Sequence, residues 1–141
     1  MVAYNQQPGV GHVPSYQISG IPYTTASFTV PASGNAPIEI AFPFVTKFVT
    51  VVNTHSGTNA ALRAGFSVNG INGAVNNNYF VLDNGDSYTG EWRVNSIYLL
   101  SDSTVNQASA SVIAGLTGVA KNSVPGIVAG TLNWSGSDGV G

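Results

Sequence analysis

The chain has 141 residues, of which only 7% are charged, and its formal net charge is -2. A chain of this length builds one domain with a hydrophobic core but is too short for two comfortable ones. The cations are scattered singly, so no basic stripe for nucleic acid is present, and the absence of cysteine excludes disulfides and thiolate metal ligands. The cations are Lys47, Arg63, Arg93 and Lys121.

No apolar run approaches the roughly 20 residues that a membrane-spanning helix needs. Residues 1–6 lack the basic start and apolar core of a secretion signal. We therefore expect no membrane insertion and a soluble product made inside the cell. A surface this poor in charge repels its neighbours weakly, which favours permanent burial in an assembly over free diffusion.

The first part of the chain predicts an arm followed by strands. Residues 1–20 hold proline and glycine among polar residues, which is typical of an extended arm that orders against a neighbouring subunit or of a disordered terminus. Apolar and polar residues then alternate over residues 23–30 and 38–42, and this pattern predicts two strands. Residues 45–53 are apolar on both faces, as in a central strand that is covered on both sides.

A further alternation predicts a strand over residues 62–68, ending at Asn69 and Gly70. The segment that follows, residues 71–78, is rich in asparagine and glycine. We expect it to be too polar and flexible to join a core.

The next stretch predicts a β-hairpin. Residues 79–82 are apolar and β-prone, residues 83–86 have the Asp-Asn-Gly-Asp composition of a tight turn, and residues 88–100 resume as a long strand. The alternation changes phase after Asn95, so we expect a bulge or a corner near Asn95 and Ser96.

The last part of the chain predicts a loop at residues 103–107 and a strand over residues 110–116. The segment from residue 118 to 141 is rich in glycine. It contains two short strand candidates, at residues 127–129 and 131–134.

Short strands separated by glycine, proline and asparagine turns, with no convincing helix, indicate an all-β protein. We predict a single jelly-roll sandwich of about eight antiparallel strands rather than an immunoglobulin-like one, because the sequence has no Cys-Trp-Cys framework. Its predicted divisions are an extended N-terminal arm (1–20), the jelly-roll domain (21–117) and a Gly-rich C-terminal segment (118–141), with Trp92 and Phe80 as core anchors.

Catalytic and metal sites are not expected. The histidines, His12 in the arm and His55 in a loop, are isolated, whereas a hydrolytic triad or a cupin metal site needs them in context. Asp83, Asn84 and Asp86 are oxygen donors for calcium in principle, but such sites gather six or more ligands, so a plain turn is favoured. We predict no catalytic, cofactor-binding or metal-binding residue, and no cofactor.

Two other patterns have both a functional and a structural interpretation. Glu91 and Arg93 are two residues apart on one predicted strand face, which fits a catalytic acid and a substrate clamp, but a solvated or intersubunit charge pair is favoured. Residues 133–135 match a glycosylation sequon, which we interpret as coincidence because no secretion signal is present.

Several segments also carry a family resemblance. They read IPYTTASFTVP at residues 21–31, IEIAFP at 38–43, NYFVLDNG at 78–85 and EWRV at 91–94. Over residues 21–116 the chain thereby resembles the single jelly-roll penton (vertex) capsid proteins of large icosahedral DNA viruses of algae.

The resemblance implies a non-enzymatic structural protein of the virion, made in the host cytoplasm. Such a protein occupies the fivefold vertices of the capsid as a homopentamer, and its partners are the neighbouring major and minor capsid proteins. No nucleic-acid partner is expected.

The alternative is a carbohydrate-binding jelly-roll module that acts in host attachment. An exposed aromatic side chain would then stack on a glycan, and the candidates are Tyr88, Tyr98 and Trp134. An enzyme is disfavoured, because the chain lacks clustered acid and base groups.

Overall fold

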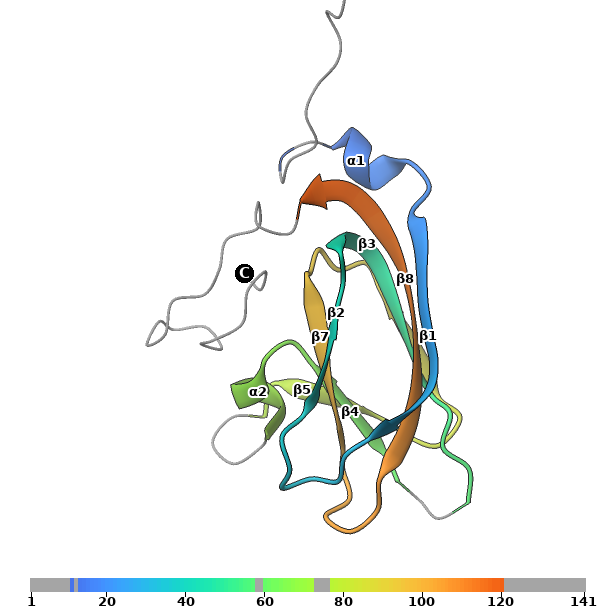
Figure 1. Cartoon of the computed structure of the whole chain (residues 1–141), viewed down its shortest axis with the longest axis vertical. Helices are drawn as coiled ribbons and strands as arrows, with labels where there is room; N and C mark the ends of the chain where they lie inside the picture. The colour runs from blue at the N-terminus through green and yellow to red at the C-terminus, as the bar shows by residue number, and fades with distance from the viewer. Residues whose placement is uncertain (1–10, 12, 58–59, 73–76, 121–141) are drawn as a thin grey trace, which may run out of the picture.

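The computed structural model describes residues 11, 13–57, 60–72 and 77–120 (Figure 1). In this part of the chain the strands form two four-stranded antiparallel sheets. The first sheet has the order β1 (Ile21–Val30), β8 (Ala108–Ala120), β3 (Phe44–Asn53) and β6 (Ser87–Gly90). The second has the order β2 (Ile38–Ala41), β7 (Ser96–Ser101), β4 (Leu62–Gly65) and β5 (Tyr79–Leu82).

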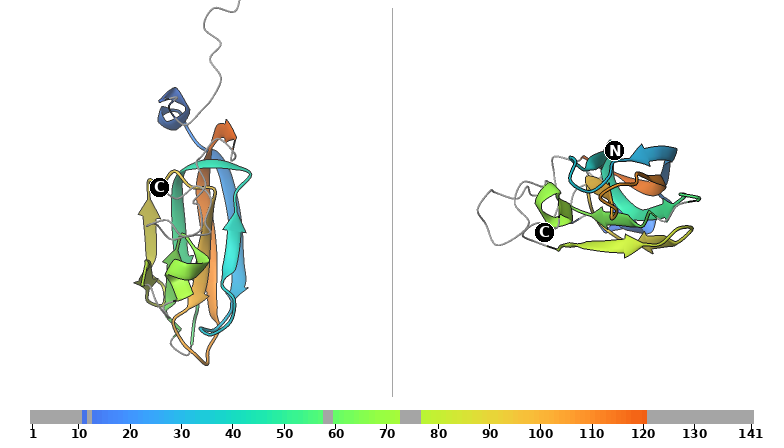
Figure 2. Two further views of the ribbon diagram at one scale, coloured as in Figure 1. Left: turned by 90° about the vertical axis from the view of Figure 1, so that its left-hand side faces the viewer. Right: turned by 90° about the horizontal axis from the view of Figure 1, so that it is seen from below.

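This arrangement confirms the predicted all-β jelly-roll sandwich. Every connection except the one from β4 to β5 crosses from one sheet to the other, so strands distant in the chain become neighbours. The first sheet orders its strands 1-8-3-6 and the second 2-7-4-5, which is the double Greek key of a jelly roll. The sandwich is elongated along its strands, as the side view in Figure 2 shows.

The core lies between the two sheets and is almost entirely aliphatic. Valines at alternate positions of β3, Val49 and Val51, meet Val112 and Ala114 across the ladder to β8, and all four are fully buried. From the opposite sheet Leu99 closes the layer. The period-two pattern of the sequence therefore places its apolar face inward, because burial of that face is the main stabilising term.

The predicted hairpin is wrong. β5 pairs with β4 and β6 pairs with β3, so the two strands belong to opposite sheets. The turn between them is nevertheless a tight one, in which Asp86 N donates to Asp83 O at 2.9 Å and Gly85 has a φ of 82°. Turn chemistry alone does not specify pairing, since the same tight turn serves a hairpin and a connection between sheets.

The long strand predicted over residues 88–100 is two strands separated by a corner at residues 91–95, which starts earlier than the bulge expected near Asn95 and Ser96. Thr46 of β3 holds this corner. Its Oγ1 donates to Trp92 O at 2.6 Å and accepts from Val94 N at 3.1 Å. The phase change in the sequence thus marks the point where the chain leaves one sheet for the other.

Residues 62–68 are not one strand, because β4 ends at Gly65 and a short helix follows. The helix, α2 (Val68–Asn72), is preceded by Ser67, whose Oγ accepts from Gly70 N at 2.8 Å as an N-cap does. The prediction that residues 71–78 stay out of a core is also wrong for Ile71, which is fully buried on the outer face of the second sheet.

Glycine makes room for this helix. A Cβ on Gly65 would lie 3.4 Å from the Cβ of Ile71, and one on Gly70 would lie 2.7 Å from the Oγ of Ser67. A side chain at Gly70 would therefore displace the hydroxyl that caps α2, and one at Gly65 would press on Asn78 O at 3.1 Å. Ile71 packs there against Tyr98 and Leu100 in a small second core.

The predicted divisions need two adjustments. In the arm, α1 (Pro14–Gln17) is a helical turn rather than extended chain, and Tyr16 packs against Val45 and Val119 of the same copy. β8 continues to Ala120, beyond the domain end predicted at residue 117. The candidate strands at 127–129 and 131–134 lie outside the described residues.

Ile71→Ala should lower the free energy of unfolding by about 2–4 kcal/mol, because it removes buried methyl groups and leaves a cavity between α2 and the sheet. Val68→Ala is the matched control on the same helix, since Val68 is exposed and surface truncations cost about 0.5 kcal/mol or less. Urea denaturation of both variants measures the difference. Equal losses would mean that α2 does not pack as described.

Candidate functional site

Aromatic side chains gather on the side of the sandwich where β5 and β6 are the outermost strands. Phe80 of β5 lies 5.4 Å from Tyr88 of β6, and Trp92 of the corner lies 5.8 Å from each of them, measured between ring centroids. Phe66, just after β4, meets Trp92 edge-on at 4.9 Å. We call these four residues the aromatic cluster.

Local sequence explains how Trp92 reaches this position. Gly90, at the end of β6, lies directly under the indole, because a Cβ built there would come within 2.1 Å of the ring. The bonds from Thr46 to the corner fix the backbone at Trp92. The indole therefore packs on the backbone of β6 at Gly90 and against the main core.

The aromatic cluster is only partly buried. Phe66, Phe80 and Trp92 pack against the main core, whereas Tyr88 is 53% exposed. Val81 of β5, which pairs with Arg63 of β4, is 45% exposed. Neither β5 nor β6 contains a charged residue, and each strand pairs on one side only. This composition resembles that of interface cores, in which aromatic groups are enriched and charged groups are depleted.

The opposite side of the sandwich, where β1 and β2 are outermost, is also closed by aromatic rings. Tyr23 of β1 meets Phe42, just after β2, edge-on at 5.1 Å. Ile21 is 53% exposed at the start of β1. The β1 ladder is irregular between Thr25 and Phe28, where Ser27 has a φ of 50°, a conformation uncommon for residues other than glycine.

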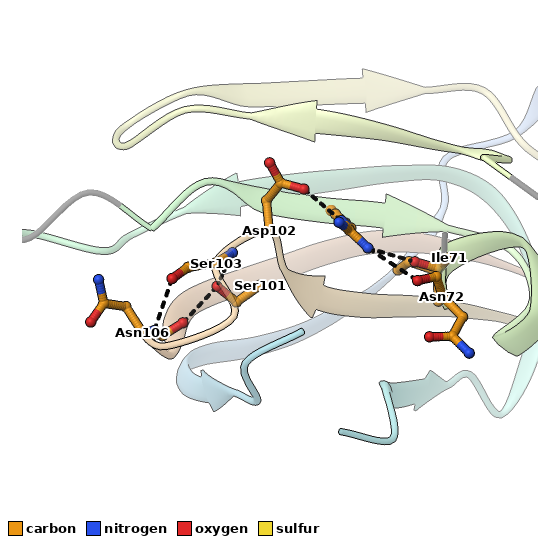
Figure 3. A network of polar contacts seen from close by, with 7 residues as sticks. Ile71, Asn72, Ser101, Asp102, Ser103 and Asn106 are labelled. Atoms are coloured by element: carbon orange, nitrogen blue, oxygen red, sulfur yellow. Dashed lines mark hydrogen bonds and ion pairs between the residues drawn. The ribbon is translucent and has the colours of Figure 1, made fainter. Parts of the chain in front are cut away.

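Arg63 is the centre of a polar network on the outer face of the second sheet (Figure 3). Its Nε donates to Asp102 Oδ1 at 2.6 Å, and its Nη1 donates to the carbonyl oxygens of Ile71 and Asn72 at 3.3 Å each. The guanidinium also lies 4.6 Å from the ring centroid of Tyr79. Arg63 thereby binds the C-terminal carbonyls of α2 and fixes the helix on the sheet, which is a structural role.

The Asp83, Asn84 and Asp86 constellation is a turn organised by backbone bonds. Gly85 N donates to Asn53 O at 3.0 Å, and the Oδ1 of Asn84 accepts from Ala60 N at 3.4 Å. Within the described ranges, no three histidine, cysteine, aspartate or glutamate side chains are grouped so that they could hold a metal ion.

Glu91 and Arg93 lie on the corner rather than on a strand face, which corrects their predicted placement, and both side chains are exposed. His55 lies half buried in the loop after β3, and His12 falls outside the described residues. Of the stacking candidates, Tyr88 is exposed and Tyr98 is buried under α2, which removes Tyr98 as a platform. Trp134 and the sequon at 133–135 lie outside the described residues.

Two members of the aromatic cluster lie elsewhere than the sequence pattern predicts. Phe80 and Trp92 were expected in the inter-sheet core, but they lie at its rim together with Phe66 and Tyr88. The feature of the sequence that indicates this cluster is the presence of aromatic residues on both sides of the turn at residues 83–86. They indicate it only once β5 and β6 are known to lie in different sheets.

Neither helix in the described part of the chain has the length and hydropathy required to cross a membrane. No protein-family model matches this chain, and no curated protein matches it.

Proposed function

We propose that this protein is a structural capsid subunit that forms the pentameric vertex of an icosahedral viral shell. The observation that carries the proposal is the strand order of the two sheets, which is that of the jelly rolls found in viral capsids. The sequence resemblance to penton proteins between residues 21 and 116 supports the same assignment.

The distribution of charge supports an assembled state. In the described part of the chain, Arg63 and Asp102 form the single ion pair, and of the four edge strands only β2 contains a charged residue, Glu39. Free proteins use surface charge to repel one another, and interface cores are depleted of it. A subunit enclosed by copies of itself and by neighbouring capsid proteins has no need of that repulsion.

Assembly through such edges should tolerate salt. Raising the ionic strength shortens the Debye length from about 10 Å at 0.1 M to about 3 Å at 1 M, which weakens charge pairs but not apolar burial. We expect the purified protein to sediment as a pentamer at both salt concentrations, with the vertex-neighbouring capsid proteins added if the isolated ring is weak. A stable monomer in every mixture would contradict the proposal.

Removal of the first part of the arm should weaken that assembly. Because Tyr16 packs on its own copy, the truncation removes residues 1–12 and leaves α1 in place. We expect the far-UV β spectrum to stay unchanged and the pentamer fraction to fall, since the arm is predicted to order against a neighbouring subunit. An unchanged pentamer fraction would show that residues 1–12 make no intersubunit contact.

A carbohydrate-binding module is the second candidate, and the exposed ring of Tyr88 favours it. One face of this ring stacks on Trp92 with an interplanar angle of 20°, which holds the side chain rigid as a stacking platform requires. Glycan-array binding by the isolated protein that is lost on Tyr88→Ala would support this function.

A further inference from the structure

We propose that Asn69 and Asn84 are latent deamidation sites, which the folded chain protects and the opened chain exposes. Each of them is followed by a glycine, Gly70 and Gly85 respectively. Asparagine deamidates most readily before glycine, because glycine has no Cβ to hinder the attack of its own amide nitrogen. This chemistry does not depend on whether the chain assembles.

The glycine amide is the nucleophile of this reaction. Once hydroxide has removed the amide proton, the glycine nitrogen attacks Cγ of the asparagine. The new N–Cγ bond forms as the Cγ–Nδ2 bond breaks, and Nδ2 leaves as ammonia. Water then opens the cyclic imide at either carbonyl and gives aspartate or isoaspartate. A glycine N–H that donates a hydrogen bond is therefore protected, as it is from hydrogen exchange, since both reactions begin with the loss of that proton.

The turn at residues 83–86 protects Asn84 in two ways. Gly85 N donates to Asn53 O of β3 at 3.0 Å, so its proton is held. Asp86 N donates to Asp83 O at 2.9 Å, and Gly85 has a φ of 82°. Because the φ of Asn84 is not positive, this is a type II turn, in which the second residue has a ψ of about 120°. The cyclic imide places the glycine nitrogen over the asparagine Cβ, which requires a ψ of the opposite sign.

Helix α2 protects Asn69 by a different bond. Gly70 N donates to Ser67 Oγ at 2.8 Å, and Gly70 is buried. A Cβ on Gly70 would lie 2.7 Å from that oxygen and 3.0 Å from the Cβ of Asn78, so the backbone here has little room to rotate toward the imide geometry. Asn69 itself is exposed. Its protection therefore comes from the glycine amide and not from burial of the asparagine.

Deamidation of an opened chain should also hinder its return to the folded state. Isoaspartate inserts its Cβ into the main chain, which lengthens the backbone at residue 84. Asn53 O accepts from Gly85 N at 3.0 Å, and Asn53 N donates to Asp86 O at 2.9 Å. A longer backbone cannot satisfy both of these bonds at their present spacing. Chains modified at Asn84 should therefore be less stable after refolding than unmodified chains.

Peptide mapping by mass spectrometry tests the proposal on the full chain, incubated at mildly alkaline pH with and without urea. Asn69 and Asn84 should each deamidate at least about tenfold more slowly in the folded protein than in urea. The third Asn-Gly sequence, at residues 72–73, extends outside the described residues, and its rate in urea serves as the reference for an unprotected site. Equal rates with and without urea at either proposed site would overturn the proposal for that site.

Two variants separate local protection from opening of the whole domain. Ser67→Ala removes the acceptor of Gly70 N and should speed deamidation at Asn69 about fivefold, the effect of one lost hydrogen bond, while Asn84 keeps its rate. Asn53→Ala loosens the turn and should accelerate Asn84 more than Asn69. Each variant is the control for the other, and circular dichroism verifies that both fold. Equal acceleration of both sites, or of neither, would show that these bonds do not protect them and would overturn the inference.

Discussion

Asn53→Asp should destabilise the protein by about 3–5 kcal/mol at neutral pH, the range for leaving a buried charge without a partner. Asn53 is fully buried at the end of β3, and its Nδ2 donates to the carbonyl oxygens of Ala60 at 3.2 Å and Leu82 at 3.0 Å. A carboxylate at this position would keep the bond that Oδ1 accepts from His55 N at 3.0 Å, but it would face two carbonyl oxygens with no proton to donate to them. Chemical denaturation at pH 7 measures the loss.

The same substitution should make stability depend on pH. Burial and the facing carbonyl oxygens raise the folded-state pKa of the new carboxyl above its unfolded value of about 3.9. The folded state then binds the proton more tightly, so the destabilisation is complete above the folded pKa and is relieved as the pH falls toward the unfolded value. The corresponding measurement is the stability difference from wild type between pH 7 and pH 4.

Asn53→Ala is the control, because it removes the hydrogen bonds without adding a titrating group. It should cost about 1–3 kcal/mol, the price of unsatisfied buried carbonyls, and its difference from wild type should be constant with pH. A difference between the Asp and Ala variants that does not change with pH would show that the carboxylate reaches solvent and that Asn53 is not enclosed as described.

Trp92→Ala should destabilise by about 3 kcal/mol, at the low end of the range for deleting large aromatics because the indole is only partly buried. The substitution removes the ring that covers Gly90 and contacts Phe66, Phe80 and Tyr88. Arg93→Ala is the neighbouring control and should change unfolding by about 0.5 kcal/mol or less, since its side chain is exposed. A loss below about 1 kcal/mol for Trp92→Ala would contradict the packing of the cluster.

The sequence by itself determined where the strands lie and what class of fold they form. Alternation with a period of two located β1, β2 and β8 to within a few residues, because one face of each strand must be buried whatever its neighbours are, and a run apolar on both faces located β3. Glycine, proline and asparagine marked the turns, since their backbone preferences act locally. Strand count and the lack of helical periodicity then indicated a jelly roll.

Only the tertiary structure decided which strands pair and what covers their outer faces. The turn at residues 83–86 is the same locally in a hairpin and in a crossing between sheets, and the choice depends on β3 and β4, which are distant in the chain. Ile71 is apolar in a polar segment, and it is buried because α2 brings it against Tyr98 and Leu100 of β7.

The candidate site divides in the same way. Composition showed that the chain is poor in charge, but the aromatic cluster exists because Phe80 of β5 and Trp92 of the corner after β6 come together. Asn53 looked like the last residue of a strand, and its role emerged only where the ends of β3 and β5 meet, with Leu82 supplying one of its acceptors. Contacts between distant segments are set by the packing of the whole core, which local pattern cannot encode.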